Sequence, residues 1–360
     1  LQHMKKKEKL NGLILDLRNN GGGIIDEAVD IVGLFTPTGT EVVQLKGRDK
    51  ANNKTYRTAN HPVDTLLPLA VLINNGSASA SEIVAGALQD LDRAVIVGKR
   101  SFGKGLVQAT YPVGFGSFIK MTTAKYYVPS GRCIQAVDYS HRNEDGSVGF
   151  VPDSLINQFT TKRGRIVYDG GGVMPDTVLN EERLSLFTLS VYARRYIDDY
   201  ATLYYKDHLD VPQIGSFKLS DEEFDRFADY LKDKPIEFTS VSETNLAKLK
   251  QSAKREGTYD KIKTELEQIE EVLKERDKAE SLRENREELR KLLEEEIISR
   301  YHYDSGQAEF SIKSDRIVET AVAILLDKPL YEEILTSRDT RKASTIAPEE
   351  GYEEEPYDGE

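Results

Sequence analysis

Two short segments of this 360-residue chain carry residue types that could perform covalent chemistry. Residues 76–82 read Gly-Ser-Ala-Ser-Ala-Ser-Glu and offer three serine hydroxyls. Residues 101–105 read Ser-Phe-Gly-Lys-Gly and hold Lys104 between two glycines. A serine nucleophile needs a base to take its proton, and none of the five histidines lies within residues 68–108. The two segments therefore predict a hydrolase in which a serine is paired with an amine rather than with an imidazole.

The serine segment follows an apolar strand, expected over residues 69–73, and opens a helix. Unpaired backbone N–H groups at a helix start can stabilise a developing oxyanion, which favours a nucleophile at this position. The same letters also fit a capping box, with Ser79 at the N-cap and Glu82 three residues later. On composition alone, Ser77 and Ser81 are equally good candidates for the nucleophile as Ser79.

Lys104 can act as a base only as a neutral amine, a form that burial and the lack of an acidic partner favour. Its glycine neighbours let other segments of the chain approach closely. A solvated lysine with no chemical role is the ordinary alternative for this residue type.

Two other motifs overlap this lysine. Residues 98–104 match most of a phosphate-binding loop, but Gly105 stands where Ser or Thr would hold Mg²⁺, and a strand follows where a helix is needed. Ser101 and Lys104 also spell S-x-x-K, the motif of penicillin-recognising enzymes, but a glycine-rich loop replaces the helix of that motif and no K-T-G segment occurs. The sequence therefore favours neither nucleotide binding nor that enzyme class.

Composition excludes several classes of protein. The net charge of −12 argues against a nucleic-acid partner, and no apolar run approaches the roughly 20 residues needed to cross a bilayer. The single cysteine, Cys133, excludes an internal disulfide framework and a thiolate metal cluster. Residues 341–360 are predicted to be a disordered acidic tail. Residues 1–4 read as a cloning remnant and residues 5–9 as a short leader, so we expect the natural chain to start further upstream.

The organisation of the chain changes near residue 180. Residues 10–180 alternate apolar strands with amphipathic helices, which predicts a layered α/β core. An early strand ends in Gly21-Gly22-Gly23, a loop that makes a tight turn or brings a backbone amide close to a substrate. Residues 181–340 predict a helical region with long helices over residues 184–205, 221–231 and 262–301. The apolar stripe of the last of these indicates packing along one face.

Separate blocks of this sequence agree in order and spacing with one known family. The chain resembles the carboxyl-terminal processing proteases, also called tail-specific proteases, which are Ser/Lys peptidases. The resemblance covers about residues 10–180 and rests on LDLRNN (15–20), GSASASEI (76–83), AGALQD (85–90), SFGKGLVQ (101–108), TAKYY (123–127), PSGR (129–132) and GVMPD (172–176).

This resemblance implies specific roles for residues in those blocks. Ser79 would be the nucleophile, Lys104 the base and Gln108 the residue that orients the lysine. Strand alternation would place Lys104 and Gln108 on one face, in agreement with that role. The oxyanion donors would be the backbone N–H groups of Gly22 and Ala80.

The family further implies a fold, an activity and a location. The fold would be a ClpP/crotonase-like layered α/β core followed by a helical C-terminal region. The activity would be that of a serine endopeptidase that cuts proteins at or near the C-terminus through an acyl-enzyme, with no metal and no organic cofactor. Asp90 matches an aspartate that supports the site in some relatives. Because bacterial members are mostly exported, the expected location is the bacterial cell envelope or periplasm, with the signal sequence missing here.

One departure from the family pattern raises an alternative. Family members usually carry a PDZ domain, which binds C-terminal tails by strand addition, and this sequence shows none. A catalytically incompetent or regulated scaffold of the same fold is therefore the second hypothesis. The expected partners are protein or peptide substrates with an accessible C-terminus, and the helical region could serve a homo-oligomer or an adaptor protein.

Overall fold

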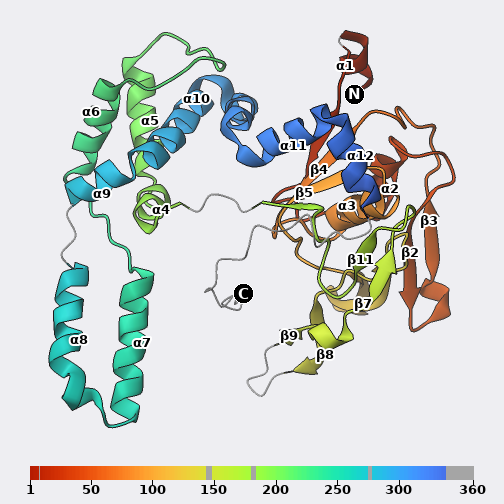
Figure 1. The fold of residues 1–360 in the computed structure, drawn as a ribbon, viewed down its shortest axis with the longest axis horizontal. Helices are drawn as coiled ribbons and strands as arrows, with labels where there is room; N and C mark the ends of the chain where they lie inside the picture. Colours follow the sequence, from red (N-terminus) through yellow and green to blue (C-terminus); the bar gives the residue numbers. More distant parts are fainter. Residues whose placement is uncertain (8, 143–147, 180–183, 275–277, 338–360) are drawn as a thin grey trace. The chain divides into compact units, whose positions relative to one another are not determined.

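The computed structural model of the chain consists of two compact units, and each is described by itself. The structure describes all residues except 8, 143–147, 180–183, 275–277 and 338–360. One unit contains Leu1–Glu181 together with the chain from Arg316 onward, and the other contains Glu182–Asp315. The expected α/β fold with a helical C-terminal region is confirmed (Figure 1). The predicted acidic tail, residues 341–360, lies outside the described residues.

A four-stranded parallel sheet forms the centre of the first unit. Its strands lie in the order β1 (Leu13–Asp16), β4 (Leu69–Ile73), β5 (Val95–Gly98) and β12 (Thr177–Val178). Every residue of β4 is fully buried, because packed layers cover both faces of the sheet. That burial explains why β4 reads as a continuous apolar run, Leu-Ala-Val-Leu-Ile, rather than as an alternating one.

The two layers that cover the sheet come from different parts of the chain. On one face, β4 packs with α2 (Ile25–Gly33) and α3 (Ala80–Asp90) in the main apolar core. On the other face, β4 and β5 pack with α11 (Arg316–Leu326) and α12 (Lys328–Thr336). From the sequence, these last two helices are expected in the helical C-terminal region. They lie instead on the core sheet, because their apolar faces bury its second side.

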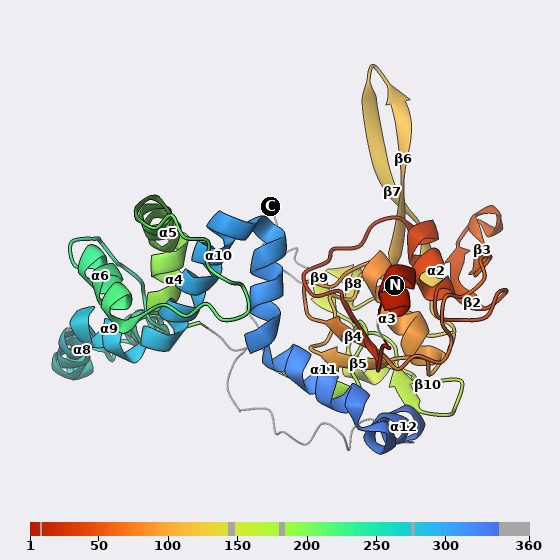
Figure 2. The same cartoon turned by 90° about the horizontal axis from the view of Figure 1, so that it is seen from above.

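A second, antiparallel sheet holds four further strands, β3 (Lys54–Arg57), β2 (Glu41–Gly47), β7 (Ser117–Tyr127) and β6 (Leu106–Gly114), in that order. Strands β6 and β7 continue as a two-stranded ribbon that projects from the unit (Figure 2). The ribbon turns at Gly114, Phe115 and Gly116, all with positive φ, and Phe115 at its tip is fully exposed. Shorter elements complete the unit: α1 (Gln2–Lys7), β8 (Val137–Arg142), β9 (Val148–Phe150), β10 (Gln158–Thr160), β11 (Ile166–Tyr168) and the 3-10 turns η1 (Lys50–Asn52) and η2 (Asp153–Leu155).

All the regular elements among the described residues of the second unit are helices. Its elements are α4 (Leu186–Ala193), α5 (Tyr196–Asp207), α6 (Asp221–Leu231), α7 (Val241–Arg255), α8 (Tyr259–Lys274), α9 (Lys278–Glu284), α10 (Arg286–Ser311, kinked at Tyr303) and η3 (Ile312–Ser314). Its apolar core joins α4, α5, α6, α9 and α10. No helix among the described residues of the chain combines the length and the apolar character that crossing a membrane requires.

Two of the long helices expected in this region are divided. The helix expected over residues 184–205 breaks between α4 and α5, where Arg195 takes a left-handed conformation with φ 60°. The helix expected over residues 262–301 becomes α8, α9 and α10. Its apolar stripe is buried only in part, since Leu289 and Leu293 are fully buried whereas Val272 is 70% exposed. The residues of the stripe therefore belong to different helices and do not share one buried face.

Candidate active site

Three loops that follow parallel strands meet at one edge of the central sheet. Strand β1 leads into the glycine loop, β4 into the serine segment and β5 into the lysine loop. Because parallel neighbours place their carboxyl ends at the same edge, the topology alone brings these segments together, and this edge is where open α/β sheets bind ligands. Direct contact follows, since the N–H of Phe102 in the lysine loop donates to the Ser77 carbonyl at 3.0 Å.

Asparagine residues link the glycine loop to the serine segment by hydrogen bonds. The backbone carbonyl of Asn20 accepts from the Ala78 N–H at 3.0 Å, and the side-chain Oδ1 of Asn20 accepts from the Ser81 hydroxyl at 3.0 Å. Asn74 Nδ2 donates to Asn19 Oδ1, and Asn74 Oδ1 accepts from the Asn19 N–H. These bonds join the loop that follows β1 to the segment that follows β4, and they fix the position of one relative to the other.

Ser79 differs from the other two serines of its segment. Ser77 is fully buried, and its hydroxyl donates to the Leu17 carbonyl at 2.7 Å. Ser81 is 4% exposed and is committed to Asn20. Ser79 is partly exposed and stands at the N-cap of α3 with φ 58° and ψ −117°, a region that non-glycine residues rarely occupy. Such strain is typical of functional positions, so among these serines the geometry favours Ser79.

The carboxylate of Glu82 lies at the centre of the site. Its Oε2 accepts from the backbone N–H groups of Ser79 at 2.8 Å and of Lys104 at 2.9 Å. Its Oε1 accepts from the Ser101 hydroxyl at 2.5 Å and from the Gly103 N–H at 2.7 Å. Burial raises the pKa of Glu82 although these four donors lower it. The shared oxygen keeps the backbone nitrogens of Ser79 and Lys104 within about 6 Å of each other.

A second side chain bridges the same two residues. The Tyr126 hydroxyl, at the core end of β7, lies 3.1 Å from the Ser79 carbonyl oxygen and also contacts the Lys104 carbonyl oxygen. Burial, followed by the nearby Glu82 charge, raises the pKa of Tyr126 well above its ordinary value. The hydroxyl therefore stays a donor at neutral pH. The Glu82 carboxylate thus binds the N–H groups of Ser79 and Lys104, and the Tyr126 hydroxyl contacts the carbonyl oxygens of the same two residues.

Gly22 packs directly against the start of α3. A Cβ on Gly22 would lie 2.5 Å from the Ala78 carbonyl oxygen and 2.7 Å from the Ala80 nitrogen, and its φ is +92°. The loop therefore lies against the backbone on both sides of Ser79. However, the Gly22 N–H donates to Asn20 Oδ1 at 2.9 Å. It would have to leave that acceptor before it could hold an oxyanion.

Substitution of Gly22 by alanine is expected to destabilise the protein by about 1–3 kcal/mol, because the methyl group clashes with backbone and the φ is unfavourable. Chemical denaturation would measure this loss. Gly23→Ala is the matched control, since a Cβ there meets no atom within 4 Å and should change stability by less than about 0.5 kcal/mol. Equal free energies of unfolding for the two variants would contradict the close approach.

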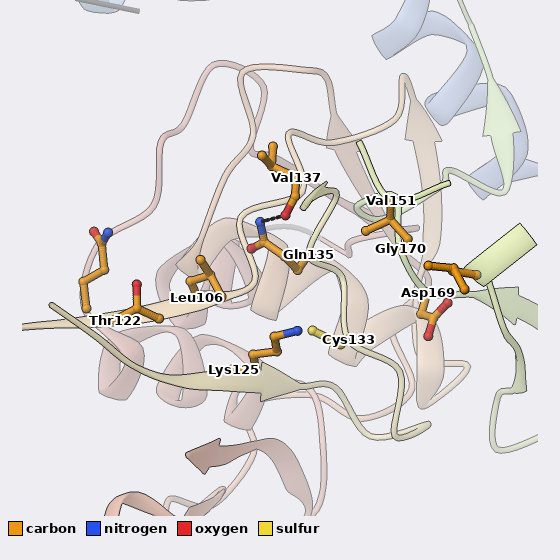
Figure 3. Close-up of a pocket in the computed structure, with 11 residues that line it drawn as sticks. Leu106, Thr122, Lys125, Cys133, Gln135, Val137, Val151, Asp169 and Gly170 are labelled. Carbon is orange, nitrogen blue, oxygen red and sulfur yellow. Dashed lines mark hydrogen bonds between the residues drawn. The ribbon is translucent and has the colours of Figure 1, made fainter. Parts of the chain in front are cut away.

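Gln108 lies apart from the Glu82 network. It is exposed on β6, whereas Lys104 lies in the loop before that strand. A register shift also falls between Val107 and Gln108. The prediction that strand alternation places Lys104 and Gln108 on one face is therefore wrong, because the two residues do not share one regular strand. Gln108 lines a cavity of about 520 Å³ that Figure 3 shows, and neither Ser79 nor Lys104 lines it.

Asp90 lies at the other end of α3, about 16 Å along the helix from Ser79. It is 2% exposed and forms an ion pair with the buried Arg132 at 2.9 Å, and it accepts from the Ser130 N–H at 2.9 Å. Its contacts therefore anchor the Ser130–Arg132 turn under the helix. Within the described residues, no group of three or more His, Cys, Asp or Glu side chains is arranged to hold a metal ion.

The roles of Glu82, Tyr126 and Ser101 are not predicted by the sequence. For Glu82 the sequence predicts only a capping box, and the structure does place Ser79 and Glu82 at the N-cap and N3 positions. One feature of the sequence could have indicated the role of Glu82: it belongs to a helix made mostly of small and apolar residues. A buried carboxylate on such a helix needs several donors, and here three of the four come from the lysine loop.

Comparisons with known proteins give two family matches and several protease relatives. The family model described as peptidase family S41 matches residues 1–141, and the model described as probable PDZ-protease, C-terminal helical domain, matches residues 187–325. A carboxy-terminal-processing protease of Bartonella bacilliformis is 43% identical over 151 residues, which cover 42% of this chain and 32% of the relative. A carboxyl-terminal-processing protease of Synechocystis sp. is 39% identical over 156 residues, which cover 43% and 33%.

Among solved structures, a photosystem II D1 C-terminal processing protease is 31% identical with a TM-score of 0.38, and the match covers 51% of this chain and 38% of that one. The chain spans about a third of the length of the two curated relatives. The blocks that carry the resemblance at residues 15–20, 76–83 and 101–108 fall within the matched residues. Over residues 1–141 the chain therefore matches peptidase family S41.

Proposed function

We propose that the chain is a serine endopeptidase that cleaves protein substrates at or near the C-terminus, with Ser79 as nucleophile and Lys104 as base. The observation that carries this proposal is the Glu82 carboxylate, one oxygen of which accepts from the backbones of both residues. A lysine side chain is long enough to span the resulting gap. The match of residues 1–141 to peptidase family S41 and the names of the curated relatives support the same activity.

The reaction proposed is acyl transfer. The Ser79 hydroxyl attacks a peptide carbonyl while the neutral amine of Lys104 takes its proton. The oxyanion is stabilised by the N–H of Ala80 at the start of α3 and by the N–H of Gly22 once it leaves Asn20. The ammonium of Lys104 then protonates the departing amine, and water hydrolyses the ester with the same lysine as base. Gln108 and Asp90 are assigned no contact with the reacting atoms.

Replacement of Ser79 by alanine is expected to abolish cleavage of an unstructured protein with an apolar C-terminal tail, because the acyl-enzyme cannot form. Mass spectrometry of the products would follow the reaction, and thermal unfolding would verify that the variant is folded. Ser117→Ala, an exposed serine on β7, should cleave like the unmodified chain. Identical fragments from the Ser79 variant would show that another group attacks the substrate. Absence of cleavage by the unmodified chain would favour the scaffold alternative.

We further propose that the protein acts in the bacterial cell envelope, since the two bacterial relatives named above are carboxyl-terminal-processing proteases. The second unit is proposed to bind an adaptor or a second copy; it contains most of the residues, 187–325, that match the model of a probable PDZ-protease C-terminal helical domain. Size-exclusion chromatography with light scattering would test the second copy, and a strictly monomeric chain would exclude it.

A further inference from the structure

The ribbon formed by β6 and β7 carries exposed apolar side chains that the proposed reaction leaves unused. It projects from the first unit (Figure 2), and residues 111–122 are all exposed. The large apolar residues of this stretch are Tyr111, Val113, Phe115, Phe118, Ile119 and Met121, and Phe115 is fully exposed. Contiguous exposed apolar groups mark an interaction surface, whereas single ones are ordinary.

Near its tip the ribbon is apolar on both faces. Successive cross-strand pairs point to opposite faces of a two-stranded ribbon. Tyr111 pairs with Ile119 on one face, and Pro112 pairs with Phe118 on the other. Phe115 lies at the end, in the turn of residues 114–116. A folded protein partner would cover one face of this tip, whereas a lipid layer surrounds an inserted tip on all sides, so the distribution favours lipid.

The two faces differ farther from the tip. The pair of Ala109 with Met121 continues the apolar face, whereas the pair of Thr110 with Lys120 makes the other face polar. The part that is apolar on both faces therefore covers residues 111–119 and is about 13 Å long, at the usual rise of an extended strand. This length is close to the depth of about 5–10 Å to which interfacial segments enter a bilayer.

The charge of the ribbon suits an anionic surface. The chain has a net charge of −12, but none of its 61 Asp and Glu residues lies in residues 93–137. Lys120 is the one charged residue in residues 106–124, and it is exposed. It lies two positions behind Phe118 on the same face of β7. A cation directly behind an apolar tip matches a bilayer, in which anionic headgroups lie above the acyl chains.

The edges of the ribbon disfavour the addition of a strand from another protein. Pro112 has no backbone N–H to donate, the pairing is irregular between Pro112 and Gly114, and Lys120 adds a charge on the other strand. Proteins protect exposed sheet edges with these same features. The remaining backbone groups of the edges need water or headgroups as partners. The ribbon can therefore enter the interfacial layer of a bilayer but not its hydrocarbon centre.

We propose that residues 111–120 bind the surface of an anionic lipid bilayer, with Phe115 and Phe118 among the upper acyl chains and Lys120 at the headgroups. The ribbon would hold the first unit at the membrane surface without crossing the membrane. This inference is independent of the proposed peptidase activity, because it uses none of the residues assigned to catalysis.

The chain contains no tryptophan, so Phe115→Trp introduces a single fluorescent reporter at the tip of the ribbon. The full chain with this substitution is titrated with vesicles of phosphatidylcholine and phosphatidylglycerol, with and without bromine on the acyl chains. We expect the emission to shift to shorter wavelength and the brominated lipid to quench it. Tyr192→Trp, at an exposed aromatic position on α4, is the matched control and should show neither change.

Further variants separate the apolar contribution from the charge, with binding measured by co-sedimentation with the same vesicles. Phe115→Ser combined with Phe118→Ser should weaken binding at least about tenfold, because burial of two aromatic side chains is lost. Lys120→Met should weaken binding about fivefold, the usual contribution of one lysine near an anionic surface. Lys162→Met, an exposed lysine outside the ribbon, should bind like the unmodified chain. Thermal unfolding would verify that each variant is folded.

Unchanged emission of the Phe115→Trp chain in the presence of vesicles would overturn the proposal, and so would equal shifts and quenching in both tryptophan chains. Equal losses from Lys162→Met and Lys120→Met would contradict it as well, since the ribbon would then have no special part in binding. A blue-shifted Phe115→Trp emission without vesicles, together with a dimer in light scattering, would show that a second copy covers the tip instead of lipid.

Discussion

Replacing Lys104 by methionine is expected to slow peptide cleavage by about 10²–10⁴-fold, the usual contribution of a positioned general base. Methionine keeps much of the length and apolar character of the lysine stem but cannot take a proton. The backbone N–H of residue 104 still donates to Glu82, so the loop should keep its position. Initial rates of peptide release at fixed pH would measure the effect.

Two further variants separate the base from the charge. Lys104→Arg keeps the positive charge but cannot deprotonate, so it should be as slow as Lys104→Met. Lys99→Met removes an ammonium from the same loop and should keep the rate within a few-fold. An active Lys104→Arg variant would mean that position 104 supplies only charge, and the proposed base would be wrong.

Replacing Glu82 by glutamine is expected to destabilise the protein by several kcal/mol and to abolish cleavage. Each carboxylate oxygen accepts two donors, whereas a glutamine has one oxygen and would turn its NH₂ toward two of those donors. Each lost bond to a charged group costs about 1.5–3 kcal/mol. Urea unfolding would give the stability, and the loss of activity should exceed what the unfolded fraction explains, because Ser79 and Lys104 lose their common acceptor.

Glu27→Gln is the matched control for this variant. Glu27 and Glu82 both occupy the third position of their helices, α2 and α3, but Glu27 is exposed. Its replacement should change stability by less than about 1 kcal/mol. If the two variants lose the same stability, the buried network around Glu82 contributes nothing beyond a favourable charge at a helix start.

The pH dependence of the Glu82 effect has a definite sign. Because burial raises the pKa of Glu82 in the folded state, the folded protein binds this proton more tightly than the unfolded chain does. The stability that Glu82 contributes is therefore fully present below its unfolded pKa, about 4.3, and is lost as pH rises through the folded pKa. The difference in unfolding free energy between the unmodified chain and Glu82→Gln should shrink with rising pH across that window.

Local signals in the sequence predicted much of the site's framework. The helix expected over residues 221–231 matches α6, because Ser220 caps its first turn and its apolar residues keep one helical period. The strand over residues 69–73 matches β4, since a short apolar run between turn residues fits a strand buried on both faces. Parallel order then places the ends of β1, β4 and β5 at one edge, where the glycine, serine and lysine loops lie.

Contacts between distant residues set what the sequence could not predict. The bonds from Glu82 to the lysine loop join residues about 20 positions apart, and the Tyr126 bridge comes from another sheet. The break at Arg195 falls within a continuous apolar pattern, so periodicity predicted one helix. The register shift after Val107 cannot be recognised from the residue types of β6. Because of it, the expected alignment of Gln108 with Lys104 does not hold.

The pairing of Ser79 with an amine can be tested most directly by covalent labelling. A fluorophosphonate reacts with a serine hydroxyl only when a nearby group activates it, and peptide mass spectrometry identifies the residue that carries the label. The account predicts a phosphonyl group on Ser79 in the unmodified chain and almost none in Lys104→Met, with both proteins folded. Labelling of a different serine, or equal labelling of Ser79 in both proteins, would contradict it.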